Sequence, residues 1–382
     1  MTAFADPDMP QSAAQPAGPA PARDYSLTGP SSDYAKEIGL AAAEWYHTDI
    51  PRKVMKDLMQ RSDGPAIRDT IIWAAAHVIL AAGGIYFWGS WWAVPFWLGY
   101  GVMYGSACDS RWHECGHGTA FRTGWMNDVV YNIASFQVIR NPVAWRWSHA
   151  RHHTDTYIVG RDPEIAFMRP PPVVKLLLAF IGVQGAWESI KIIARQAGGR
   201  LSDDEKDYIP ETERPKAIFA ARVHMVIYAL TLIATILMLA SGYGWASAIP
   251  FLLIGGPRIY GAWHMVMAGL LQHGGLADNV VDHRLNSRTV YMNPISRFIY
   301  WNMNYHIEHH MFPMVPYHAL PRLHELVKND YPPPNTSILD GYIEMYKAVK
   351  RQLKDPEYYL RRELPPTAKP YRDEFHNFFV TR

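Results

Sequence analysis

TIIWAAAHVILAAGGIYFWGSWWAVPFWLGYGVMYGSAC, residues 70–108, contains no Asp, Glu, Lys or Arg in 39 consecutive positions. About 20 apolar residues of helix cross a bilayer, so this run is long enough for two crossings. Gly89 and Ser90 interrupt the run near its middle, where a tight turn is expected. The stretch therefore predicts a transmembrane hairpin with spans at about 70–88 and 91–108.

A second uncharged run extends from Val223 to Pro257. It predicts a second hairpin with spans at about 219–240 and 244–265, and a bend at 255–257 where the last helix leaves the bilayer. The alternative is a soluble all-α protein with two buried hairpins, which two runs of this length disfavour. The expected fold class is an all-α integral membrane protein with four transmembrane helices in two hairpins.

The charges orient these helices. Neither interhelical turn is charged, and every Lys and Arg lies in the N-terminal arm, in 109–222 or in the C-terminal third. By the positive-inside rule these regions and both termini are cytoplasmic, and the inner membrane of a bacterium is the expected location. Two cysteines make no disulfide framework, which favours a reducing compartment. The net charge of +2 gives no reason to expect a nucleic-acid partner.

Composition divides the chain into three parts. Residues 1–32 are rich in Pro and Ala with few bulky apolar side chains, which predicts a disordered tail. Residues 33–345 are expected to form one membrane domain, and 346–382 a C-terminal tail. Since the uncharged runs lie inside 33–345, any cytoplasmic cap over the bilayer must come from the charged segments of the same domain.

Eight of the seventeen histidines fall in three short clusters. Residues spaced i, i+3 and i+4 share one face of a helix, so each cluster can aim its imidazoles at one point. Neutral imidazole binds Zn, Cu, Fe and Ni, and one zinc takes only three or four protein ligands, so eight histidines indicate two metal ions. The clusters are HECGH (His113, His117), HARHH (His149, His152, His153) and HIEHH (His306, His309, His310).

The first cluster is also a literal H-E-x-x-H, the motif of helical zinc proteases, in which Glu114 would be the general base. An intramembrane protease of this kind needs a further ligand, typically Asp, within the membrane. The runs 70–108 and 223–257 contain no carboxylate, and six further histidines would have no role. A metal transporter would need polar ligands at mid-membrane depth, whereas these clusters lie beyond the ends of the predicted spans.

HxxxH, HxxHH and HxxHH, in this order and separated by a predicted hairpin, resemble the three histidine boxes of the membrane fatty acid desaturase family. That family also contains hydroxylases and related oxygenases. WNMNYHIEHHMFPMVPYHALPRLHE, residues 301–325, is similar to the third-box region of its bacterial acyl-lipid members. The three intervening residues of the first box and the histidine that opens the third also favour acyl-lipid enzymes. The resemblance covers about residues 70–330.

The resemblance implies a site of two irons ligated by the eight box histidines. The family uses one more ligand shortly before the third box, for which His273 in LLQHGG is the candidate. His264, nine residues earlier on the same predicted helix, is about 13.5 Å away and is left out. His283 ranks behind all of these as a ligand. The resemblance thus implies a cytoplasmic helical cap that holds a di-iron site with nine histidines.

The implied reaction is O₂-dependent desaturation of a fatty acyl chain, with hydroxylation of a lipid or another hydrophobic substrate as the alternative. Removing hydrogen from an unactivated methylene needs a metal-based oxidant. The sequence has no dinucleotide fingerprint after a strand and no cysteine set for an iron–sulfur cluster, so a separate ferredoxin, rubredoxin or cytochrome with its reductase is expected to supply electrons.

Carboxylates near the boxes are expected to orient the ligating imidazoles by accepting their second N–H. Spans two and four lead into the boxes and are expected to line the substrate tunnel, so that Leu at Gly101 or Gly105 would shift or block substrate use. The candidate carboxylates are Glu114, Asp155, Asp162, Glu164, Asp278 and Glu308.

Overall fold

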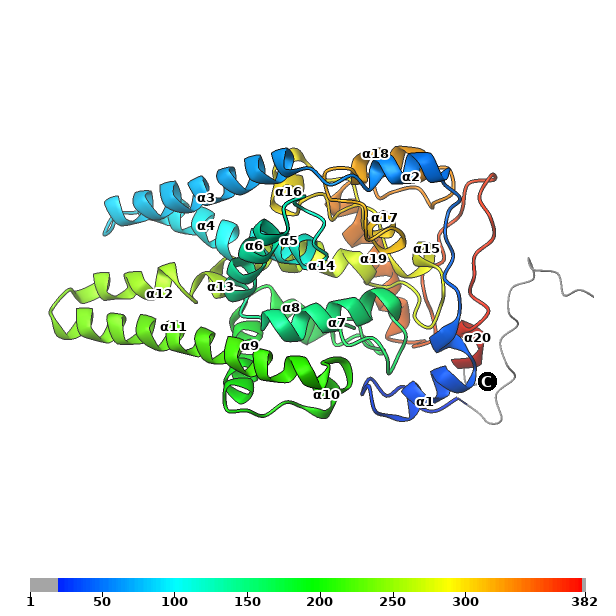
Figure 1. The fold of residues 1–382 in the computed structure, drawn as a ribbon, viewed down its shortest axis with the longest axis horizontal. Helices are drawn as coiled ribbons and strands as arrows, with labels where there is room; N and C mark the ends of the chain where they lie inside the picture. Colours follow the sequence, from blue (N-terminus) through cyan, green and yellow to red (C-terminus); the bar gives the residue numbers. More distant parts are fainter. Residues whose placement is uncertain (1–19, 380–382) are drawn as a thin grey trace, which may run out of the picture.

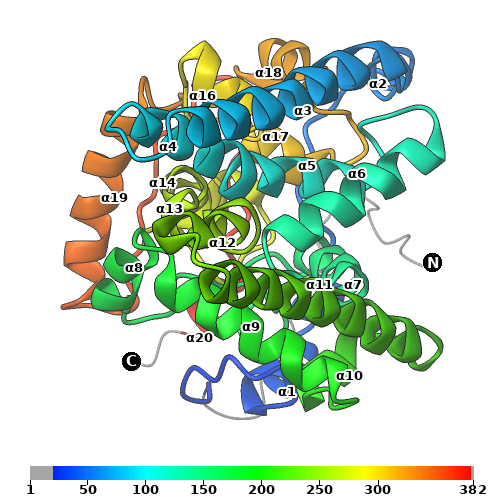
Figure 2. The ribbon, with the colours of Figure 1, turned by 90° about the vertical axis from the view of Figure 1, so that its left-hand side faces the viewer.

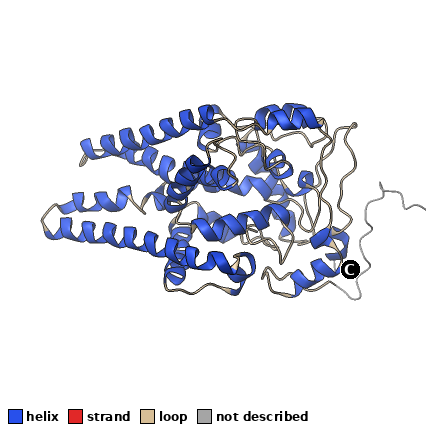
Figure 3. Cartoon of the chain, in the orientation of Figure 1, coloured by secondary structure: helices blue, strands red, loops and turns tan. Residues whose placement is uncertain are grey.

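The computed structural model describes residues 20–379, and this part of the chain is helical, with no β-strand (Figures 1 and 3). The predicted all-α class is therefore confirmed. The α-helices are α1 (Pro30–Glu37), α2 (Arg52–Leu58), α3 (Asp63–Tyr86), α4 (Ala93–Gly105), α5 (Ala107–Gly116), α6 (Gly124–Gln137), α7 (Pro142–Thr154), α8 (Val173–Ala179), α9 (Val183–Ala197), α10 (Asp203–Tyr208), α11 (Arg214–Ala240), α12 (Ile249–Leu253), α13 (Pro257–Tyr260), α14 (Trp263–His273), α15 (His283–Asn286), α16 (Pro294–Ile299), α17 (His306–Met311), α18 (Leu320–Val327), α19 (Ile338–Gln352) and α20 (His376–Phe379).

Two helical segments are long and apolar enough to cross a membrane: Arg52–Tyr86, which contains α3, and Glu211–Ala240, which contains α11. A third exists if α8 and α9, which meet at 89°, are counted as one broken span. The sequence patterns did not predict this bent pair. Its side chains Val174, Leu177 and Trp187 are exposed, so the pair presents an apolar surface.

Two hairpins extend from one end of the molecule. In Figure 1, α3 lies beside α4, and α11 lies beside α12. Gly89 and Gly242, in the two connecting turns, have φ of +82° and +83°, the left-handed region in which a side chain is strained. In Figure 2 the two hairpins lie on opposite sides of α13. Both turns occur where the sequence predicts them.

The segment 244–265, predicted as a bent span, consists of a 3₁₀ turn (Gly244–Ala248) followed by α12, α13 and the start of α14. The interruption begins at Ile254, whose backbone is extended, and continues at Gly255, with φ of +85°. A Cβ on Gly256 would lie 2.5 Å from the Phe251 carbonyl oxygen. The bend predicted at 255–257 is therefore present, but it breaks the helix.

Helix α4 packs against α13 through glycines. A Cβ on Gly261 would lie 1.9 Å from the backbone of Gly101, and one on Gly105 would lie 2.4 Å from the Pro257 carbonyl oxygen. Leu at Gly101 or Gly105 would therefore force these backbones apart. The two glycines serve helix packing in this structure, so the tunnel prediction cannot be tested at these positions.

Both ends of the described chain pack onto the helical body. Residues 1–19 of the predicted tail lie outside the described residues, but Arg23 forms ion pairs with Asp278, at 3.2 Å, and with Glu357. Leu360 donates its N–H to the carbonyl of Gly275. The predicted boundary at 345/346 falls inside α19. These ordered contacts within 20–32 and after 345 differ from the expected tails, because buried ion pairs and backbone hydrogen bonds anchor them.

Candidate metal centre

Four helices, α5, α7, α14 and α17, bring the nine predicted histidines together within the helical body from which the hairpins extend (Figure 1). Trp112 on α5, Met265 on α14 and Trp301 before α17 belong to one buried cluster, which fixes these segments against one another. The helix α7 begins with an N-cap in which Asn141 accepts hydrogen bonds from two backbone N–H groups. The histidines come from α5 and its C-cap (His113, His117), α7 (His149, His152, His153), α14 (His273) and α17 (His306, His309, His310).

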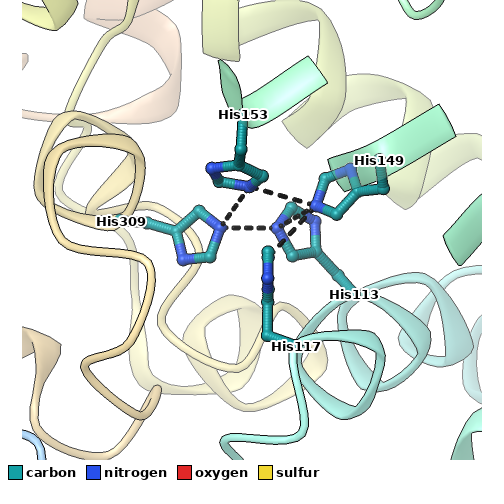
Figure 4. A group of neighbouring side chains, drawn as sticks. All are labelled: His113, His117, His149, His153 and His309. Carbon is teal, nitrogen blue, oxygen red and sulfur yellow. Dashed lines mark hydrogen bonds between the residues drawn. The ribbon is translucent and has the colours of Figure 1, made fainter. Parts of the chain in front are cut away.

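Five of these histidines form the first set, in which each offers one ring nitrogen within 4.8 Å of the others. The Nε2 atom of His149 lies 3.0 Å from that of His113, 3.2 Å from that of His117 and 3.1 Å from that of His153. Figure 4 shows the five rings pointing toward one another. The members of the first set are His113, His117, His149, His153 and His309.

The remaining four histidines form the second set. His152, His273 and His310 have ring nitrogens within 4.8 Å of one another. The Nε2 atom of His306 lies 3.1 Å from that of His273 and 3.0 Å from that of His310. The structure therefore brings all nine predicted histidines into two adjacent groups. His283 lies beside the second set, with its ring centroid 5.2 Å from that of His310.

The donor geometry fits metal ions better than hydrogen bonds between imidazoles. A neutral imidazole nitrogen is either one donor or one acceptor, so His149 Nε2 cannot hydrogen-bond three other Nε2 atoms at once. Burial lowers the pKa of His113, His153 and His310, and the neighbouring histidines lower it further, so the rings are neutral. Several neutral nitrogens that converge on one point are the donor set of a cation such as iron.

The outer ring nitrogens have acceptors that fix which nitrogen carries the proton. His152 Nδ1 lies 2.8 Å from the Asp162 carboxylate, and His273 Nδ1 lies 2.6 Å from the Asn286 carbonyl oxygen. His149 Nδ1 lies 3.2 Å from the Glu164 carboxylate. A proton held on Nδ1 leaves the Nε2 lone pair facing inward, as a metal ligand requires.

Acidic side chains lie directly behind the ligand sets. Burial acts to raise the pKa of Glu164, but the adjacent His149 and His152 lower it to about 2, so this carboxylate is ionised. Burial likewise acts to lower the pKa of His152, but the Asp162 carboxylate raises it. The negative charge of Glu164 would offset the positive charge of bound metal ions.

Other predicted carboxylates have different partners. Glu114 is fully buried, accepts hydrogen bonds from Thr119 and from the Tyr317 backbone, and has an oxygen 3.5 Å from His309 Nδ1. Burial raises its pKa to about 8. Three others have partners outside the two histidine sets. Asp155 pairs with Arg161, Asp278 with Arg23 and Arg169, and Glu308 with His324 and Thr289.

Replacing Asp162 by Asn is expected to weaken iron retention by about 10–100-fold, the usual effect of losing a carboxylate behind a ligating histidine. The amide keeps the size of the side chain but removes the charge behind His152. The measurement is the iron that remains after dialysis against graded chelator concentrations. Asp155→Asn is the matched control, since Asp155 pairs with Arg161. Equal retention in both variants and the wild type would contradict the role assigned to Asp162.

The fatty acid desaturase family matches residues 89–341, which is well over half of the chain. The chain belongs to this family. It is 22% identical to a Delta(12) acyl-lipid conjugase (11E,13E-forming) of Impatiens balsamina, over 63% of this chain and 66% of the relative. It is 23% identical to an acyl-lipid omega-3 desaturase (cytochrome b5) of the endoplasmic reticulum of Arabidopsis thaliana, over 71% and 72%.

A third relative, the sn-1 acyl-lipid omega-3 desaturase (ferredoxin) of a Nostoc species, is 32% identical over 19% of this chain and 20% of its own length. The chain thus spans 66% of the conjugase and only a fifth of the Nostoc enzyme. The matched residues 89–341 contain both histidine sets. Membership of the desaturase family therefore rests on the part of the chain that carries the candidate metal centre.

Proposed function

We propose that the chain is an O₂-dependent di-iron desaturase that introduces a double bond into a fatty acyl chain. The observation that carries the proposal is the convergence of nine buried or half-buried imidazoles in two adjacent sets of five and four. Each set has enough neutral nitrogen donors for one iron. The two sets touch, since His309 of the first lies on the same helical turn as His306 and His310 of the second.

When bound, the two irons would activate O₂ for the removal of hydrogen from an aliphatic chain, which no side-chain acid or base can achieve. The histidines would hold the irons, and their neighbours orient the rings: Asp162 and Glu164 fix two of the imidazoles, and the Asn286 carbonyl fixes His273. Hydroxylation of the same carbon is the close alternative, because it begins with the same hydrogen abstraction. Which product forms depends on how the acyl chain is positioned.

The contacts of Glu114 argue against a zinc protease. Its Oε2 accepts hydrogen bonds from Thr119 and Tyr317, and its Oε1 lies 3.5 Å from His309 Nδ1, behind the ring and not on the side of the inward-facing Nε2 where a metal-bound water would be. A general base must reach the proton that it removes. A transporter is disfavoured as well, because the helices that carry both sets lie in the helical body and not in the projecting hairpins (Figure 1).

We further propose that the two hairpins cross the membrane four times and that the helical body is a cytoplasmic cap. The 24 residues of α3 and the 27 of α11 give lengths of about 36 and 40 Å, more than the roughly 30 Å of hydrocarbon. Trp91 and Trp245, at the two hairpin tips, are 90% and 91% exposed, as expected for aromatic residues in a membrane interface. The domain includes α19, so it extends beyond residue 345.

Electrons are proposed to come from a separate carrier protein. The chain has two cysteines, too few to hold an iron–sulfur cluster. The printed names of two relatives indicate ferredoxin for the Nostoc enzyme and cytochrome b5 for the Arabidopsis enzyme. A one-electron carrier of this kind is therefore the class of partner proposed for this chain.

The test is product analysis after expression in a host whose membrane lipids are saturated or monounsaturated. Under air, we expect fatty acids that are two mass units lighter than their precursors and that contain no oxygen from ¹⁸O₂. Under nitrogen we expect no new product. A product that gains one ¹⁸O would support the hydroxylase instead, and cleaved peptides without new lipid products would contradict both.

A further inference from the structure

The segment before α2 places one aromatic side chain against the rear of the second histidine set. The indole of Trp45 stacks on the ring of His283, with centroids 4.3 Å apart and planes 11° apart. The ring of His283 in turn lies 5.2 Å from the ring of His310. His283 is buried and Trp45 is half-buried. The stack therefore runs from the protein surface to a proposed iron ligand in two ring-to-ring steps.

The position of Trp45 is fixed by its neighbours. Its Nε1–H donates to the carbonyl of Thr154, at 3.1 Å. The next residue, Tyr46, donates its backbone N–H to Val281 and lies with its ring 3.6 Å from the guanidinium carbon of Arg284. Thr154 directly follows His153 of the first set, which is itself half-buried. Trp45 thus lies at a surface close to both sets.

We propose that a small one-electron carrier protein docks on the surface around Trp45, and that electrons pass through the rings of Trp45 and His283 to the iron held by His310. This inference rests on the proposed di-iron function. Each transfer oxidises the carrier by one electron and reduces one ferric iron to ferrous iron. Electron tunnelling weakens steeply with distance, so a stack of rings in contact offers the shortest conducting route through protein.

A second aromatic route exists and provides the competing hypothesis. The half-buried Trp145 lies 5.3 Å from Trp112, which lies 5.2 Å from His149. However, Trp145 packs under Arg140, and Arg140 pairs with Asp109 at the beginning of α5, the end nearest the hairpins. A water-soluble carrier would have to reach this tryptophan next to the membrane. The position of Trp45, beside the cap segment that follows α7, has no such obstacle.

The experiment uses the full-length, iron-loaded protein and measures the rate of iron reduction in a stopped-flow instrument. The reductants are reduced ferredoxin, reduced cytochrome b5 and, as a small molecule that needs no docking, the methyl viologen radical. Trp45→Leu is expected to slow reduction by the more effective carrier by about tenfold, the effect of removing a central aromatic contact. It should leave iron content and reduction by viologen unchanged. Trp45→Phe, which keeps a stacking ring, should retain most of the rate.

Other outcomes separate the alternatives. An unchanged carrier rate in Trp45→Leu, or an equal loss with carrier and viologen, would overturn the proposal. If only Trp145→Leu slowed iron reduction by the carrier, the electron route would run through Trp145 and Trp112. If viologen reduces the irons of the wild-type protein but neither carrier does, the proposal that a carrier of this class docks here is wrong. A wild-type protein without two reducible irons would instead show that the proposed function fails. His283→Leu should repeat the effect of Trp45→Leu, while His283→Phe should not.

Discussion

His309→Ala is expected to weaken retention of the iron of the first set and to abolish oxidation of the acyl chain. The Nε2 atom of His309 lies 2.6 Å from that of His113 and 3.2 Å from that of His153, so its ring is central to the first set. The second set keeps all of its nitrogens in this variant. The measurement is iron per chain by elemental analysis, together with product formation under air.

His318→Ala is the matched control for this variant. His318 lies in the segment that follows α17, is half-buried, and belongs to neither set. It should keep about two irons and wild-type product levels. Full activity in His309→Ala, or equal loss of iron in both variants, would contradict the assignment of His309.

His273→Ala is expected to have an effect of similar size, with loss of the iron of the second set and of product. The Nε2 atom of His273 is 3.1 Å from that of His306, and its Nδ1 is held by the Asn286 carbonyl. Without this ring the second set has three nitrogens and an open position on its α14 side. The readouts are iron per chain and product, as before.

His264→Ala provides the control on the same helix. His264 contacts Ser296, at 3.1 Å between Nε2 and the hydroxyl oxygen, and lies outside both sets. It should retain both irons. If His273→Ala kept both irons while His264→Ala lost one, the ninth ligand would have been placed on the wrong residue of α14.

Helical spacing predicts the clusters of histidines, and the structure adds a rule that the spacing alone did not reveal. In each box, the two histidines spaced i and i+4 belong to the same set, since such residues lie on one face of a helix. His152 and His309, each three residues after the first histidine of its box and so rotated away from the pair, serve the opposite set. This division could not be drawn from the sequence because it depends on how α5, α7 and α17 face one another.

Two parts of the fold were not predictable from charge runs. The sequence of α8 and α9 contains the charged residues Lys175, Glu188 and Lys191, so no uncharged run marks the pair. The fourth predicted span is uncharged from 244 to 257, but the helix is interrupted at Gly255, where the backbone adopts φ of +85°. Hydropathy reports the environment of a segment and does not report the backbone geometry within it.

The Trp45–His283 stack was missed for a related reason. Trp45 and His283 are more than 200 residues apart in the chain and neither belongs to a histidine box. No periodicity connects them. Only the path of the segment before α2, fixed by Tyr46 and Thr154, brings the two rings together.

The metal content of the purified, detergent-solubilised protein tests the central claim most directly. Two adjacent sets of five and four histidines predict about two irons per chain, with little zinc. The Mössbauer spectrum of the ⁵⁷Fe-labelled protein should show both irons as high-spin sites with nitrogen ligands. One zinc per chain and no iron would contradict the account, because a single H-E-x-x-H site would then explain the metal without the other histidines.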